Sequence, residues 1–109
     1  MARHSYGRTS ESEIAIAALR IAGSRPNGEV STHLLKQMIP DYINLTPGDL
    51  NPSPTRPNEQ MWHQIVGNII SHRENEGNII GDGYADYTGT GIRITQAGRL
   101  YLRSLGHDE

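Results

Sequence analysis

The sequence predicts an α+β fold in a single domain, and three observations support this prediction. Four segments carry apolar residues at helical spacing, and two short β-like runs bracket a segment rich in Gly, Asp, Tyr and Thr. The length of 109 residues is typical of one domain. Because only 35% of the residues are apolar and none is Phe, we expect a modest core of aliphatic side chains around Trp62.

The first helix is predicted to begin at a capping box. Ser10 is followed three positions later by Glu13, and apolar residues then recur at helical spacing until Gly23, which is placed to end the helix. Turn-forming residues at 24–28 separate this helix from a short strand at 29–30.

A second helix follows, and a proline limits its length. Ser31 or Thr32 can cap its start. Pro40 lacks the backbone donor that a helix interior needs, so we expect the helix to end or kink there. Four prolines and several small polar residues between 44 and 58 predict a loop, with one turn of helix after Thr46.

The third helix has the most regular pattern in the chain. Asn58 precedes a run in which apolar residues recur every three or four positions from Trp62 to Ile70, and Gly77 supplies a stop. We therefore predict a helix over about 58–76.

The rest of the chain predicts a hairpin and a final helix. Residues 78–80 and 91–94 are the β-like runs, and residues 81–91 form a long tip between them. Thr95 can cap the last helix, and Gly106 lies at its end. We accordingly expect three parts: a flexible basic arm at 1–9, a domain at 10–106 and a tail at 107–109.

The order of these elements is that of a winged helix-turn-helix, with a three-helix core, a two-stranded wing hairpin and a C-terminal helix. The stretches WHQIVGNIISHRENEGNII and GIRITQAGRLYL resemble the N-terminal winged-helix domain of Mrr-type restriction proteins, over roughly Ile14 to Leu105. The resemblance implies a domain that targets a restriction or nuclease system. This chain lacks the nuclease domain that normally follows and has an acidic, Gly-rich wing, so we expect no cutting of DNA.

One flank of the third helix predicts recognition of DNA bases. Solvated helix faces usually carry Lys and Glu, whereas this flank carries amides, a hydroxyl and a glycine. Asn and Gln donate and accept at once, which matches the edge of adenine in the major groove. The alternative is an ordinary water-facing surface. The flank comprises Gln60, Gln64, Gly67, Asn68, Ser71 and Asn75, with His63 and His72 at its borders.

The start of the third helix predicts phosphate binding. Unpaired backbone amides at a helix start attract anions, and Arg56 is the strong charge there. Arg93, on the returning strand, is a further phosphate candidate. The alternative is that Asn58 caps the helix and Arg56 is solvated. The polar residues of this start are Ser53, Thr55, Arg56, Asn58 and Gln60.

The wing residues and the composition limit the classes of function that the sequence allows. Tyr84 and Tyr87 are candidate contacts to a partner or to a groove, although Asp82 and Asp86 beside them would repel phosphate. The formal net charge is -2, which excludes a protein that coats nucleic acid by its overall field. The chain has no Cys, and no carboxylate cluster or triad context, so we expect no enzyme activity, metal or cofactor.

We therefore expect a non-catalytic module that binds double-stranded DNA, either as a targeting domain of a restriction or nuclease system or as a small transcriptional regulator. A homodimer or a nuclease partner would strengthen its binding. The sequence contains no apolar run of membrane length and no leader pattern, so we expect a cytoplasmic protein. The alternative is a protein-association or dimerisation module that uses the wing and the last helix without DNA.

Overall fold

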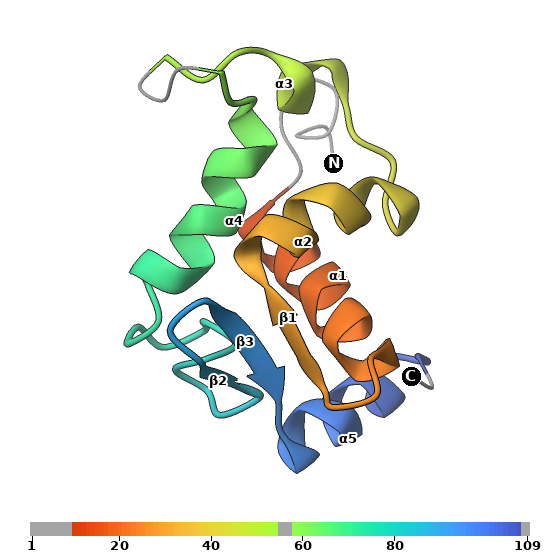
Figure 1. The fold of residues 1–109 in the computed structure, drawn as a ribbon. Helices are drawn as coiled ribbons and strands as arrows, with labels where there is room; N and C mark the ends of the chain where they lie inside the picture. The colour runs from red at the N-terminus through yellow and green to blue at the C-terminus, as the bar shows by residue number, and fades with distance from the viewer. Residues whose placement is uncertain (1–9, 55–57, 108–109) are drawn as a thin grey trace.

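The computed structural model describes residues 10–54 and 58–107. Within these residues the chain forms five α-helices, a short 3-10 helix and a three-stranded antiparallel sheet, which confirms the α+β class (Figure 1). The elements, in chain order, are α1 (Glu11–Ser24), β1 (Glu29–Ser31), α2 (Thr32–Met38), η2 (Ile39–Asp41), α3 (Pro47–Leu50), α4 (Met61–Ser71), β2 (Ala85–Tyr87), β3 (Gly91–Ile94) and α5 (Gln96–Ser104).

Hydroxyl caps begin several helices where the sequence predicts them. The Ser10 side chain accepts from the backbone of Glu13 in a complete capping box, and Thr95 accepts from Gly98 at the start of α5. The single helical turn expected after Thr46 is confirmed as α3, which has a capping box of its own. Helix α2 ends at Met38, and Pro40 lies in the 3-10 turn that follows.

The sheet has the strand order β1-β3-β2. Val30 and Tyr87 both lie opposite Ile92, one from each neighbouring strand, and share a face with it because side chains alternate along a strand. Arg93 points to the other face, where Glu29 and Asp86 lie opposite it. The helices cover the apolar face, since Val30 and Ile92 are buried.

Helix α1 runs through the centre of the core and packs against α4, α5 and β3. Its residues Ile14, Leu19 and Ile21 are fully buried, and Leu102 of α5 is equally buried. Trp62 is 2% exposed and belongs to the same cluster, so the predicted aliphatic core around this residue is confirmed.

The predicted strand at 78–80 is wrong. Asn78 is buried, its Nδ2 donates to the Ile69 carbonyl oxygen at 2.9 Å, and its Oδ1 accepts from the Ile80 amide at 2.8 Å. These bonds fold the segment into a turn, as Asn side chains commonly do. The outgoing strand of the hairpin is β2, which begins at Ala85, so the connection to β3 is only Thr88–Thr90 and not a long tip.

The third predicted helix is real but shorter than 58–76. Before the helix, residues 52–53 pair with residues 59–60: the Ser53 amide donates to the Glu59 carbonyl, and Pro52 forms an isolated β-bridge with Gln60. Gln60 is the N-cap residue, so the alternative in which Asn58 caps the helix is wrong; Asn58 lies two positions earlier with a φ of 67°. The helix ends at Ser71, well before Gly77, which leaves Asn75 outside it.

Candidate nucleic-acid interface

Helix α4 has one buried side and one open side, as its pattern predicts. Trp62, Ile65, Val66 and Ile69 are buried against the core. The opposite side, here called the outward flank of α4, consists of Gln60, Gln64, Gly67, Asn68 and Ser71. Its members are half-exposed, apart from Ser71, which is exposed.

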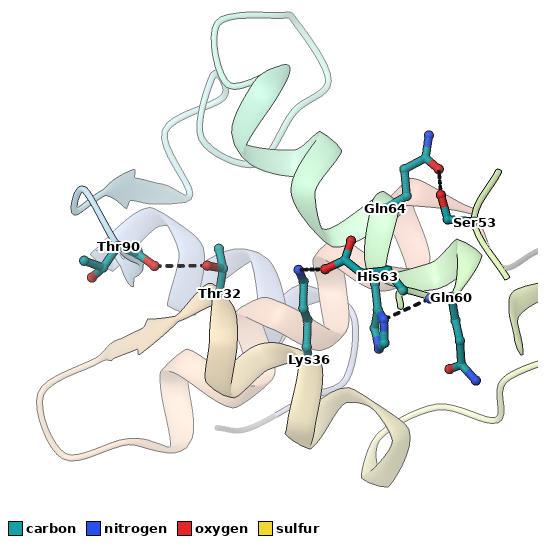
Figure 2. Close-up of polar contacts among 8 residues, drawn as sticks. Thr32, Lys36, Ser53, Gln60, His63, Gln64 and Thr90 are labelled. Atoms are coloured by element: carbon teal, nitrogen blue, oxygen red, sulfur yellow. Dashed lines mark hydrogen bonds and ion pairs between the residues drawn. The ribbon is translucent and has the colours of Figure 1, made fainter. Parts of the chain in front are cut away.

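The first half of the outward flank is tied to the chain itself. The Ser53 hydroxyl donates to Gln64 Oε1 at 3.1 Å, and the Trp62 indole donates to Gln60 Oε1 at 2.9 Å. Figure 2 shows Gln64 directed toward Ser53. Each amide oxygen already accepts one internal hydrogen bond, so either glutamine can contact adenine only through its second lone pair and in the orientation that the internal bond sets.

The second half of the outward flank is open. The side chains of Asn68 and Ser71 make no hydrogen bond to any other described residue, and Gly67 between the two halves leaves the helix backbone uncovered. Among the described residues, Asn68 is thus the one amide side chain of the flank that makes no internal hydrogen bond.

His63 stabilises the start of α4 and does not supply a positive charge for DNA. Its Nδ1 accepts from the Gln60 amide at 3.1 Å, so this nitrogen is unprotonated (Figure 2). Burial lowers the pKa of His63. The charge of Glu59 acts in the opposite direction and raises this pKa, whereas the charge of Lys36 lowers it further. A neutral ring is therefore favoured near neutral pH, in the position that Glu or Gln usually takes in a capping box.

Two cations lie beside α4, and neither was a sequence candidate. Lys36 of α2 forms an ion pair with Glu59 at 2.7 Å. Arg73 follows α4, donates to the Ile70 carbonyl at 2.9 Å and places its guanidinium 4.6 Å from the centre of the Tyr87 ring. Lys36 is the only lysine in the sequence, and this rarity was the one feature of the sequence that could have indicated it as a candidate.

A hollow of about 240 Å³ separates α2, α4 and the turn between β2 and β3. The Thr32 amide and hydroxyl both donate to the Thr90 carbonyl, at 2.9 and 3.3 Å, and hold the turn against α2 (Figure 2). We call this space the α2–α4 hollow. It is lined by Thr32, Lys36, Gly67, Ile70, Tyr87, Gly89 and Thr90.

The contact residues predicted on the wing and on the returning strand lie in different parts of the structure. Tyr84 stacks on Tyr101 of α5 with ring centres 4.3 Å apart, so it packs within the domain. Tyr87 is 42% exposed and lines the α2–α4 hollow. Arg93 pairs with Glu29 at 2.9 Å on the sheet face that points away from α4. Thr55 and Arg56 lie outside the described residues.

Other site types find no support in the described ranges. Residues 10–54 and 58–107 contain no group of three or more His, Asp or Glu that could hold a metal ion. No helix in this part of the chain is long and apolar enough to cross a membrane. Comparisons with protein-family models, with curated proteins and with solved structures give no significant match.

Proposed function

We propose that this protein is a winged-helix module that binds double-stranded DNA and does not catalyse a reaction on it. Two features of its topology support the winged-helix assignment. Strand β1 lies between α1 and α2 in the sequence and pairs with β3, and the β2–β3 hairpin lies beside the C-terminal half of α4 (Figure 1). In such domains the hairpin is the wing and the helix before it enters the major groove.

The observation that carries the DNA proposal is the open half of the outward flank next to two cations. Asn68 can make a two-bond contact with adenine, and Ser71 can donate to or accept from several bases. Lys36, which lines the α2–α4 hollow, and Arg73, whose guanidinium lies against the Tyr87 ring, supply charge for the sugar-phosphate backbone. Arg56 and the start of α4 remain candidates for a further phosphate contact.

The biological setting of this module follows from the resemblance to Mrr-type proteins. We propose a targeting role in a restriction or nuclease system, with a small transcriptional regulator as the other use of the same surface. Both roles need recognition of a duplex and neither needs a reacting group in this domain.

Fluorescence anisotropy with a labelled duplex library tests the function. Asn68→Ala should reduce discrimination between duplexes that differ by one A·T pair by about 1 to 3 kcal/mol. Gln96→Ala is the matched control, since it removes an exposed amide from α5. Equal discrimination by the wild type and the Asn68 variant would contradict base reading by α4, and no binding of any duplex would overturn the proposal.

A second candidate function is self-association through α5. Leu100 of α5 is 51% exposed and Leu105, the residue after α5, is 44% exposed, so this end of the domain offers apolar area that a second copy could cover. Sedimentation velocity tests it. A dimer that Leu100→Glu converts to a monomer would support this candidate, and a wild-type monomer at high micromolar concentration would exclude it.

A further inference from the structure

The α2–α4 hollow combines a cation with uncharged walls and lies directly beside the proposed DNA-reading flank. Resting on the DNA-binding function proposed above, we infer that this hollow receives one phosphate group of the DNA backbone. The phosphate replaces the carboxylate of Glu59 as the partner of Lys36. The ion pair between Lys36 and Glu59 is therefore a contact that opens when DNA binds.

The lining of the hollow fits a phosphate and its sugar. Lys36 provides an ammonium donor, and the Thr90 hydroxyl donates to no described residue. Gly67, Ile70 and Tyr87 form an apolar wall that suits the carbon face of a deoxyribose. None of the seven lining residues is acidic, and Asp86 is directed to the opposite face of the sheet from Tyr87.

The existing ion pair is suited to exchange. The side chains of Lys36 and Glu59 are each 26% exposed, so the pair lies near the surface, although the second carboxylate oxygen, Glu59 Oε1, is buried. An ion pair of this exposure contributes little to stability, and a phosphate is a stronger acceptor for an ammonium than a single carboxylate oxygen. The new contact to phosphate therefore offsets the loss of the pair with Glu59.

Position explains why Glu59 controls the affinity. Lys36 lines the hollow, whereas Glu59 approaches it from the segment before α4 and does not line the hollow. Without DNA, the carboxylate neutralises the ammonium. During docking, the same carboxylate repels the approaching phosphate. Glu59 thus weakens binding equally on every DNA sequence, a role opposite to that of a contact residue.

Two variants with matched controls test the inference by anisotropy across a salt series. Lys36→Met should weaken duplex binding about tenfold on all sequences and reduce the log-log salt slope by about 1. Glu59→Gln should tighten binding about two- to fivefold, because the pair that must open has gone. Arg93→Met and Glu29→Gln remove the corresponding charges from the ion pair between Arg93 and Glu29, on the outer sheet face, and should change affinity less.

A direct readout uses the single lysine of the chain. Reductive methylation with labelled carbon keeps the charge of Lys36 and gives it an NMR signal that is separate from that of the N-terminal amine. Addition of duplex should move this signal in the wild type. A stationary signal combined with duplex-induced shifts at Asn68 and Ser71 would overturn the phosphate site and leave α4 binding intact. No shift anywhere would overturn both.

The Glu59 variant protects the test against misfolding. If Lys36→Met loses the helical circular dichroism of the wild type, Glu59→Gln alone decides the question, since a gain of affinity cannot come from loss of structure. Unchanged or weaker binding by folded Glu59→Gln would contradict the exchange of partners at Lys36.

Discussion

At the scale of single residues, His63 connects pH to the start of α4. The folded protein uses Nδ1 of His63 as an acceptor, and the pKa of the ring is lowered by burial. The folded state therefore binds a proton less readily than the unfolded state, whose His has the ordinary pKa of 6.5. Stability from this group is full above pH 6.5 and declines as the pH falls through that value toward the lower folded pKa.

His63→Gln tests this pH dependence. Gln at the same position of a capping box still accepts a hydrogen bond but does not titrate near neutrality. We expect thermal denaturation to show a larger loss of Tm between pH 8 and pH 5 for the wild type than for the variant. An equal loss of Tm in the two proteins would contradict the assignment of this pH dependence to His63, since both proteins contain the other histidines.

Asp49 is a second residue whose removal has a defined effect. It is fully buried, accepts from the Thr46 amide at 2.8 Å and donates its own amide to the Thr46 hydroxyl. Asp49→Ala should reduce the free energy of unfolding by about 1 to 3 kcal/mol, because it removes the carboxylate that accepts from the half-buried Thr46 amide. Urea denaturation measures this loss. Asp49→Asn, which keeps one acceptor oxygen, should lose less.

Residue-level prediction works where the partner is a few positions away. The caps at Ser10 and Thr95 were visible in the sequence because a cap and its amide are three residues apart. The bond between Ser53 and Gln64 was not visible, since it depends on how a proline-rich loop folds over α4. The sequence therefore named the amides of the flank without showing which are already occupied.

At the scale of elements, Gly91 fixes how closely β3 approaches β1. A Cβ atom built at this position would lie 2.0 Å from the Val30 carbonyl oxygen. Gly91→Ala should force the strands apart and cost about 1 to 3 kcal/mol of stability, measured by urea denaturation. Gln96→Ala, at an exposed position, should change stability by less than about 0.5 kcal/mol. Equal stability of the two variants would show that the strand contact is looser than described.

Element boundaries were harder to predict than element types. The apolar period identified α4 correctly, but a helical period carries no information about competing side-chain bonds. Asn78 takes the Ile69 carbonyl, to which the Arg73 amide would bond in a longer helix, and thereby favours an end near Ser71. The same residue turns the apolar pair Ile79 and Ile80 away from a strand.

At the scale of the whole molecule, the order of elements was predictable and the α2–α4 hollow was not. Helical and β periods in sequence order are sufficient to expect helices around a small sheet. The hollow requires Thr32, Gly67 and Tyr87 to meet, and these residues come from three separate elements. Local sequence patterns do not show which distant residues come into contact. Lys36, which lines the same hollow, was therefore not predicted as a candidate.

The low overall charge makes a prediction about salt. Because the formal net charge is -2, attraction to DNA must come from a few local cations. We expect weak binding by a single copy and a log-log salt slope equivalent to about three to five released counterions, measured by anisotropy between low and physiological salt. A slope near zero would contradict phosphate contact.

The most direct test of the account is an amide chemical-shift titration with a random-sequence duplex library. The central claim is that DNA docks on the open half of α4 beside the hollow. We predict that the largest shifts fall on Asn68, Ser71 and the lining residues Thr32, Lys36 and Thr90. Shifts confined to α5 around Leu100 and Leu105, or no shifts at all, would contradict the claim.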